Sequence, residues 1–323
     1  MNFELIFFFK LILMDFFDQI QNFQKYDYDS IEFKDEIGSG ANSTVYKCLI
    51  DNNVFAIKEY DTTKWDDFEV FKEDFIYELE VANRTRGCKR VMKTYGVSNK
   101  DDYIYLIMEY LGKNDLYDYL QRESEWTPCY KIGNLISPNP KNNYVIYNEE
   151  QDIYWNYTMS NETKIKLSKK LLESVKEIHD RSIVHGDIKS NNIGYSLRNE
   201  SLKLIDLGSS TIMKNKNIVK IDCKYGTEGY MASEQYSYFV GYKSDIYSVG
   251  VVLVEIWCGD IWENAVGYKP CRNEVLKCIR KMEQSSDKNI LEYTKLIRKC
   301  LNSDMDKRPD SDKVLKNFMK IFP

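Results

Sequence analysis

The segment from Asp245 to Cys258 constrains the fold more than any other part of the chain, because it is apolar on nearly every side. A helix of this kind is stable only inside a large globular unit, where no face of it meets water. Gly259 follows directly and is a typical helix stop. The chain has 323 residues, of which 43% are hydrophobic and 29% charged. This is long enough for such an interior and typical of a globular protein.

The N-terminal part of the chain has a different pattern. Residues 28–110 are strand-like, with β-branched and aromatic residues at 54–58 and 103–108 and one helical stretch at 65–83. After Leu111 the apolar residues recur at helical spacing. Strands followed by helices predict an α+β fold with two lobes. We expect a small, mainly β N-lobe at 28–110 and a larger, mainly α C-lobe at 111–323.

Two segments stand outside this scheme. Residues 121–163 are rich in Tyr and Asn and contain three prolines, which predicts a long insertion that is either functional, for example in binding a partner, or poorly ordered. Within the N-terminal extension 1–27, Phe3–Phe17 is very apolar, but its longest uncharged run, Leu5–Phe9, is too short for a transmembrane span. Glu4, Asp15, Asp18 and Asn22 would share one stripe of a helix, so we expect an amphipathic helix docked on the domain or on a partner.

Charge and cysteine usage exclude several classes of protein. The net charge of -5 argues against a nucleic-acid partner, which normally requires a basic surface. The eight cysteines are scattered without a C-x-x-C pair, and His179 and His185 are the only histidines, so the sequence offers no zinc-binding constellation. Reduced thiols favour an intracellular, cytoplasmic location.

Two motifs lie in the strand-rich part. The run Gly38-Ser39-Gly40-Ala41-Asn42-Ser43-Thr44-Val45 would let backbone N–H groups approach phosphate oxygens, although a glycine-bearing hairpin turn explains it equally well. Lys58 ends the next strand. It would bind phosphate if an acidic residue of the following helix held it, and Glu78 is the candidate, with Glu80 as rival. The alternative is a lysine that only reaches for water.

The strongest local signal is Val184-His185-Gly186-Asp187-Ile188-Lys189-Ser190-Asn191-Asn192, followed by Asp206 in Leu204-Ile205-Asp206-Leu207-Gly208. An aspartate and an asparagine amide supply the hard oxygen ligands that Mg²⁺ prefers. A second carboxylate can accept the proton of an attacking hydroxyl, and a lysine can steady a transferred phosphate. Each residue taken alone could be merely solvated. Their combination predicts phosphoryl transfer.

These motifs resemble the catalytic loop and the metal-binding DFG region of the eukaryotic protein kinase family. The similarity runs from about Ile31 to Pro323. Gly226-Thr227-Glu228-Gly229-Tyr230-Met231-Ala232-Ser233-Glu234 is similar to the end of the kinase activation segment. Lys243–Gly250 is similar to the start of the family's buried central helix. Lys307-Arg308-Pro309 supplies the arginine that in the family pairs with the glutamate, here Glu234.

The resemblance implies ATP and Mg²⁺ as cofactors and a protein as substrate. Asp187 would orient the substrate hydroxyl as the base, Lys189 would steady the γ-phosphate, and Asn192 and Asp206 would hold the metal. Met108 would gate the adenine pocket, residues 109–111 would form the hinge and Asp115 would bond the ribose. The implied ATP-binding residues are Ile37, Gly38, Ser39, Gly40, Ser43, Val45, Ala56, Lys58, Glu78, Met108, Glu109, Leu111 and Asp115.

The sequence also departs from the family. Gly186 replaces the arginine that commonly pairs with a phosphorylated activation loop, so we expect activity without that phosphorylation. Ser43, Leu207 and Ser233 are milder replacements. Lys189 and the Gly226-Thr227 pair favour serine/threonine over tyrosine as acceptor. Two alternatives stay open: a pseudokinase scaffold, and a small-molecule kinase of the aminoglycoside or choline type, which shares the H-G-D-x-x-x-x-N loop.

Overall fold

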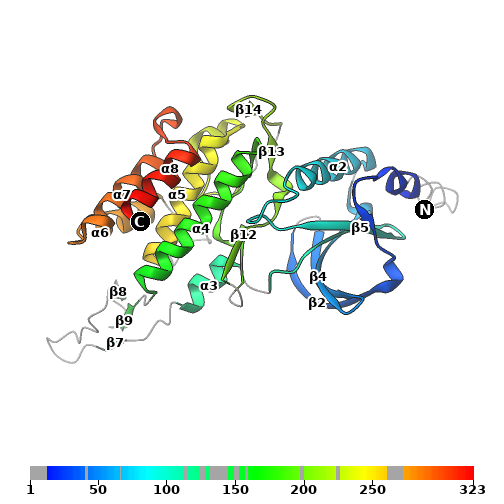
Figure 1. Cartoon of the computed structure of the whole chain (residues 1–323), viewed down its shortest axis with the longest axis horizontal. Coiled ribbons are helices and arrows are strands. Elements are labelled where there is room, and N and C mark those ends of the chain that lie inside the picture. Colours follow the sequence, from blue (N-terminus) through cyan, green and yellow to red (C-terminus); the bar gives the residue numbers. More distant parts are fainter. Residues whose placement is uncertain are drawn as a thin grey trace. The chain divides into compact units, whose positions relative to one another are not determined.

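A computed structural model describes residues 13–40, 43–65, 67–112, 115–123, 129–130, 145–148, 153–156, 159–196, 200–222, 226–259 and 272–323. The chain divides into two compact units, residues 1–113 and residues 114–323 (Figure 1). Among the described residues, no helix is both long and apolar enough to cross a membrane.

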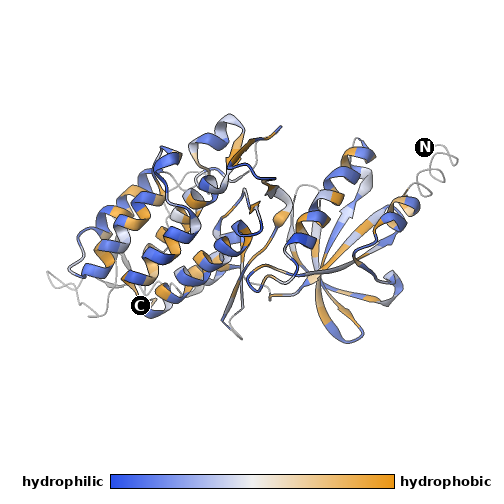
Figure 2. Cartoon of the chain, turned by 45° about the horizontal axis from the view of Figure 1, so that its top comes forward, coloured by the Kyte–Doolittle hydropathy of each residue, from blue (hydrophilic) through white to orange (hydrophobic). Residues whose placement is uncertain are grey.

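A six-stranded sheet with the order β1-β5-β6-β4-β3-β2 forms the centre of the N-terminal unit. All neighbouring pairs are antiparallel except β1 with β5. Figure 2 shows both hydrophobic and hydrophilic residues in this sheet, and the central strand β6 is buried over Ile104–Met108. The strands are β1 (Gln24–Lys25), β2 (Ile31–Ser39), β3 (Ser43–Ile50), β4 (Asn53–Asp61), β5 (Thr94–Lys100) and β6 (Tyr103–Glu109), and 3-10 turns cover η1 (Tyr28–Ser30) and η2 (Thr62–Lys64).

One long helix, α2 (Phe68–Arg84), packs on this sheet. Its first turn is fixed by Asp67, whose carboxylate accepts a hydrogen bond from the backbone N–H of Glu69 at 2.9 Å. The helix therefore begins three residues later than the predicted start at Trp65. Phe71, Phe75 and Leu79 recur every four residues and are buried in the core of the unit.

The N-terminal segment is part of the same core. Residues 13–19 are helical, and Leu13, Phe16, Phe17, Ile20 and Phe23 are buried against α2 and the sheet, whereas Asp15 and Asp18 are exposed. The amphipathic helix of the N-terminal extension stays a prediction, and Glu4 lies outside the described part. The segment ends in β1, which runs so close to β5 that a Cβ on Gly96 would lie 2.1 Å from the carbonyl oxygen of Gln24.

The C-terminal unit is mainly helical. The helix α5 (Tyr242–Cys258) packs between α4 and α7, and all its residues from Ser244 to Cys258 except Tyr247 are buried. It ends at Gly259, which has a φ of +79°. The prediction of a buried central helix is thus confirmed, with a start three residues earlier than expected. The helices are α3 (Leu116–Glu123), α4 (Asn161–His179), α5, α6 (Arg272–Met282), α7 (Lys288–Cys300) and α8 (Ser311–Ile321).

Short strands and 3-10 turns connect these helices and carry the loops that matter below. The strand pairs are β10 (Ile183–Val184) with β13 (Thr211–Ile212), β11 (Ile193–Ser196) with β12 (Ser201–Leu204), and β14 (Ile218–Lys220) with β15 (Phe239–Gly241). The 3-10 turns are η3 (Ser190–Asn192), η4 (Leu207–Ser209), η5 (Ser233–Ser237) and η6 (Met305–Lys307).

The predicted insertion at 121–163 needs a correction. Its first three residues belong to α3 and its last three to α4, and between them β7 (Cys129–Tyr130), β9 (Ile153–Asn156) and β8 (Val145–Asn148) form an antiparallel sheet. The β8 and β9 segments contain runs of β-branched and aromatic residues, which favour strands. The other residues of the insertion lie outside the described part of the chain.

Candidate active site

The glycine-bearing turn joins β2 and β3. Gly38 faces Val45 and Ser39 faces Thr44 across the pair, and the backbone N–H of Gly40 donates to the carbonyl of Ser43 at 2.8 Å. Among the described atoms, a Cβ would meet nothing nearer than 3.9 Å on Gly38 or 3.7 Å on Gly40, and neither residue has a positive φ. The hairpin itself therefore does not require glycine. This favours the interpretation in which the missing side chains leave the backbone accessible to a ligand.

The apolar residues predicted to surround adenine lie together in the N-terminal unit. Ala56 and Met108 are buried and face each other across β4 and β6, and Ile37 and Val45 pack against the same cluster. The predicted hinge follows at the end of β6, where the backbone N–H of Glu109 donates to the carbonyl of Lys93 at 2.8 Å. Leu111 is half-buried.

Lys58 and Glu78 form the predicted ion pair. The ammonium nitrogen of Lys58 lies 3.0 Å from Oε1 of Glu78, and each side chain is only 15% exposed. The rival Glu80 instead pairs with Arg84 at the surface, at 3.2 Å. Two residues further along β4, the hydroxyl of Tyr60 donates to Oε2 of Glu78 at 2.5 Å. Both oxygens of the Glu78 carboxylate are therefore held.

In the C-terminal unit, the predicted residues Lys189 and Asn192 and one further residue, Thr227, meet around the Asp187 carboxylate. Its Oδ1 accepts a hydrogen bond from the hydroxyl of Thr227 at 2.8 Å, and its Oδ2 accepts one from the amide of Asn192 at 3.0 Å. Lys189 lies 3.1 Å from Oδ2 and donates to the Thr227 hydroxyl at 2.8 Å. A carboxylate offers about four acceptor positions, so this network leaves room for one more hydroxyl.

The β11–β12 hairpin brings Asn192 and Asp206 to one end. Ile193 faces Leu204 in the pair, and the backbone N–H of Ile205 donates to the carbonyl of Asn192 at 3.0 Å. Asp206 follows directly, exposed and with a left-handed φ of 55°. Because the Asn192 amide nitrogen is used by Asp187, its oxygen is the atom left for a ligand. One carboxylate and one amide oxygen are a donor set that fits Mg²⁺.

Asp115 has structural partners of its own. Its Oδ1 accepts from the backbone N–H of Asp118 in the first turn of α3, and its Oδ2 accepts from the amide of Asn191 at 3.1 Å. Burial raises the pKa of the Asp115 carboxyl, although these hydrogen bonds oppose the shift. The predicted contact of Asp115 with a ribose stays a prediction.

Arg308 and Glu234 form the predicted pair. The guanidinium donates to both carboxylate oxygens, at 2.6 and 3.0 Å, and the Arg308 side chain is 0% exposed. Burial by itself would raise the pKa of Glu234, but the hydrogen bonds from Arg308 and Ser244 hold it below its ordinary value. The carboxylate is therefore ionised, and it fixes the end of the Thr227–Glu234 segment.

Comparison with known proteins decides the family. The chain matches the family model of the protein kinase domain over residues 31–319. It belongs to the protein kinase family. The chain is 27% identical over 281 residues to the probable serine/threonine-protein kinase 2 of Plasmodium falciparum, with 83% of this chain and 45% of that protein covered.

Two further relatives agree. The chain is 25% identical to the serine/threonine-protein kinase MPS1 of Encephalitozoon cuniculi, covering 88% of this chain and 42% of that protein. It is also 25% identical to the wall-associated receptor kinase-like 3 of Arabidopsis thaliana, covering 88% of this chain and 37% of that protein. The kinase domain described here thus spans less than half the length of these relatives.

Sequence reasoning missed two residues that shape the site of this kinase domain. Asp245, in the first turn of α5, accepts hydrogen bonds from the backbone N–H groups of His185 and Gly186 at 2.8 and 3.0 Å, and so holds the loop that precedes Asp187. A carboxylate inside an otherwise apolar helix was the available signal. Tyr60 gave no signal, because a tyrosine on a strand is ordinary.

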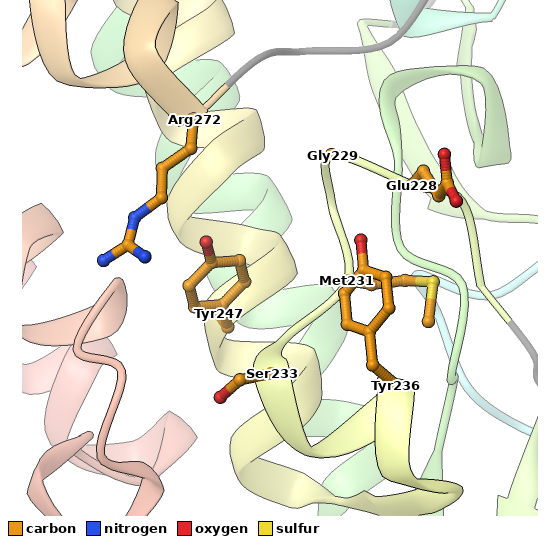
Figure 3. A pocket seen from close by; sticks show the side chains of 7 residues that line it. All are labelled: Glu228, Gly229, Met231, Ser233, Tyr236, Tyr247 and Arg272. Atoms are coloured by element: carbon orange, nitrogen blue, oxygen red, sulfur yellow. The ribbon is translucent and has the colours of Figure 1, made fainter.

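A pocket of about 500 Å³ lies beside Thr227 in the C-terminal unit (Figure 3). Glu228, Gly229 and Met231 contribute one wall directly after Thr227, and Arg272 at the start of α6 lies on the opposite side. The phenol rings of Tyr236 and Tyr247 stand between them. The lining of the pocket therefore includes the Arg272 cation, the Glu228 carboxylate, the hydroxyls of Ser233, Tyr236 and Tyr247, and apolar ring surface.

Proposed function

We propose that this kinase domain is an active enzyme, which transfers the γ-phosphate of ATP to serine or threonine hydroxyls of proteins with the help of Mg²⁺. The network of Asp187, Lys189, Thr227 and Asn192 is the observation that supports this most strongly. It holds a carboxylate, an ammonium and an amide within hydrogen-bonding distance of one another, and these are the groups that phosphoryl transfer uses.

The chemistry assigned to each group follows from its charge and partners. Asp187 would accept the hydrogen bond of the acceptor hydroxyl and take up its proton as the oxygen attacks phosphorus. Lys189, held beside it by Thr227, would offset the negative charge of the transferred phosphoryl group. Asn192 and Asp206 would hold the Mg²⁺, which neutralises phosphate charge when bound. In the N-terminal unit, Lys58 would bind the phosphates that the turn at Gly38–Ser43 covers.

Two observations weigh against the alternatives. A pseudokinase scaffold does not need the contacts around Asp187. The three ionisable residues that the family uses for phosphoryl transfer are nevertheless all present here, as Lys58, Asp187 and Asp206. A small-molecule kinase needs no Glu234–Arg308 pair, which here is buried and bidentate. Two similar proteins, those of P. falciparum and E. cuniculi, are named serine/threonine-protein kinases.

We further propose that activity does not depend on activation-loop phosphorylation. Gly186 occupies the position of the family's phosphate-binding arginine, and the contacts of Thr227 with Asp187 and Lys189 form in the unmodified chain. Single alanine variants of Ser209, Ser210 and Thr211 should keep most of their activity. Large losses that only a phosphomimetic residue reverses would contradict this.

The pocket beside Thr227 is suited to a side chain of the protein substrate. An acceptor hydroxyl bound at Asp187 would place neighbouring substrate residues near Thr227, and Glu228 and Gly229 line the pocket directly after it. We propose that an acidic side chain is preferred on the Arg272 side of the pocket, away from Glu228, because Arg272 and the hydroxyls of Tyr236 and Tyr247 complement a carboxylate.

A phosphotransfer assay with Mg-ATP tests the proposed function. The full chain is incubated with a peptide library that contains serine, threonine or tyrosine acceptors, and with aminoglycosides and choline in parallel reactions. We expect phosphorylated serine and threonine peptides, and a loss of several orders of magnitude for Asp187→Asn. Asp180→Asn, at a surface pair with Lys176, is the matched control. Turnover unchanged by Asp187→Asn would overturn the proposal.

A further inference from the structure

The carboxylate of Glu78 is shared between two residues of one strand. Lys58 and Tyr60 lie two positions apart on β4, so their side chains point to the same face of the sheet. Lys58 occupies Oε1 at 3.0 Å, and the Tyr60 hydroxyl occupies Oε2 at 2.5 Å. The Lys58 ammonium also lies 5.1 Å from the centre of the Tyr60 ring. Tyr60 therefore contacts both members of the ion pair.

The Tyr60 hydroxyl is a permanent donor. Tyr60 is only 6% exposed. Burial, and then the neighbouring Glu78 carboxylate, raise the pKa of the Tyr60 phenol well above its ordinary value. The phenol thus keeps its proton throughout the physiological pH range and donates a hydrogen bond to Oε2 of Glu78.

The ring of Tyr60 is in turn connected to the N-terminal segment. It packs edge-on against Phe75 of α2, with the ring centres 5.4 Å apart, and Phe75 packs edge-on against Phe16 at 6.2 Å. Phe16 also contacts Phe68, at the first position of α2, at 6.0 Å. A continuous row of aromatic contacts therefore runs from Phe16 through Phe75 to Tyr60 and the Glu78 carboxylate.

The N-terminal segment is attached at the other end of α2 as well. Arg86, two residues beyond the helix, donates to the backbone carbonyl of Asn22 at 2.7 Å. Its guanidinium also lies 5.3 Å from the centre of the Phe23 ring. We call residues 13–23 the N-terminal clamp, because they contact α2 at its start through Phe68 and beyond its end through Arg86.

We propose that Tyr60 is a positioning residue for the ion pair of Lys58 with Glu78, and that the N-terminal clamp acts through it to keep α2 in the register that the pair requires. This rests on the proposed function, in which Lys58 binds the phosphates of ATP. Glu78 belongs to α2, whereas Lys58 and Tyr60 belong to the sheet. Two bonds from the sheet to one carboxylate fix its orientation, which one bond alone leaves free to rotate.

The hydroxyl of Tyr60 gives the sharpest test. Tyr60→Phe keeps the ring contacts and removes only the bond to Glu78. We expect the dissociation constant for ATP, measured on the full chain by calorimetry, to rise on the order of ten-fold, since a hydrogen bond to a charged group is lost. The dissociation constant for adenosine should not change, because adenosine has no phosphate for Lys58 to bind.

Tyr105→Phe is the matched control. It removes another buried phenol hydroxyl of the same unit, which lies in a separate cluster with Ile57 and Ile107. It should leave both dissociation constants unchanged. If Tyr60→Phe binds ATP as the wild type does, or loses ATP and adenosine to the same extent, the positioning role is wrong.

The clamp is tested by Phe16→Ala, with Phe16→Leu as the conservative variant. We expect Phe16→Ala to weaken ATP binding but not adenosine binding, Phe16→Leu to restore most of it, and Phe16→Ala to add little to Tyr60→Phe in the double variant. Should Phe16→Ala not fold, Arg86→Met removes the contact with Asn22 from an exposed position. Unchanged ATP affinity in a folded clamp variant would refute the role of the clamp.

The same measurements separate this inference from the proposed function. A wild-type chain that binds ATP more tightly than adenosine but phosphorylates no peptide would refute the proposed catalytic activity alone. The positioning role of Tyr60 would then still be decided by the two dissociation constants.

Discussion

Replacing Gly186 by alanine is expected to disturb both the stability of the chain and the loop that carries Asp187. Gly186 has a φ of +81°, and a Cβ at this position would lie 2.5 Å from the carbonyl oxygen of Ser209. Ser209 belongs to η4, directly after Asp206. The absence of a side chain at Gly186 thus lets the loop with Asp187 approach the loop with Asp206.

The size of the expected destabilisation follows from the φ of Gly186 and from the short distance to the Ser209 oxygen. A left-handed φ costs a residue with a Cβ about 1–2 kcal/mol. The contact must also open from 2.5 Å to the 3.4 Å of ordinary van der Waals contact, and overpacking of this kind costs about 1–3 kcal/mol. We expect Gly186→Ala to lower the free energy of unfolding by about 2–5 kcal/mol. A displacement approaching 1 Å at the site is expected to lower kcat by about 100-fold.

Urea unfolding followed by circular dichroism, together with the phosphotransfer assay, measures both effects. Gly87→Ala is the matched control, since Gly87 has a φ of +86° but a Cβ there would meet no described atom within 4 Å. The Gly87→Ala variant should lose only the conformational contribution to the free energy of unfolding, about 1–2 kcal/mol, and keep its activity. A loss for Gly186→Ala no larger than that for Gly87→Ala would refute the reasoning. Gly186→Arg would meet the same backbone barrier, so restoring the family's arginine should not install a phosphorylation switch.

Three further outcomes are expected. Burial lowers the pKa of Lys164 to about 8, so the cost of burying the charged ammonium is complete below that pH and disappears as the pH rises to 10.5. Between pH 8 and 10.5 the free energy of unfolding of the wild type, measured in urea, should therefore rise by about 3 kcal/mol relative to that of Lys164→Met. A flat difference would contradict this. Arg308→Met should lower the free energy of unfolding by about 3–5 kcal/mol in the same experiment, because it leaves the Glu234 carboxylate buried without its cation. A decrease of less than about 1 kcal/mol would refute this prediction. Arg272→Glu should shift peptide selection from acidic to basic residues, whereas unchanged selection would exclude the pocket from substrate binding.

The sequence by itself determined which residues are candidates for phosphoryl transfer and in which order the helices and strands follow one another. The spacing from Asp187 to Asn192 is fixed within one short loop, and the step from Gly38 to Lys58 is fixed by two consecutive hairpins, β2–β3 and β3–β4. Hydrophobic patterning was enough to predict β4, β6 and α5. The partners of Lys58 and Arg308 also followed from the sequence, through the resemblance to the family.

The insertion and the helix boundaries were predicted less well. The start of α2 depends on which residue caps it, and the Asp67 carboxylate decided that against Trp65. The strand β7 pairs with β9 across the 22 residues between Tyr130 and Ile153, whereas β8 and β9 pair across only the four residues between Asn148 and Ile153. The distant pairing of β7 with β9 has no local periodicity that a sequence pattern could show.

Only the tertiary structure decided how the candidate catalytic groups are supported. Asp245 reaches back about 60 residues to hold the backbone of His185 and Gly186, and Tyr60 meets Glu78 across 18 residues. The N-terminal clamp reaches Arg86 across 64 residues. Local sequence fixes which groups can carry charge or donate a proton. Where those groups lie depends on contacts between distant segments, because burial and packing are properties of the folded chain as a whole.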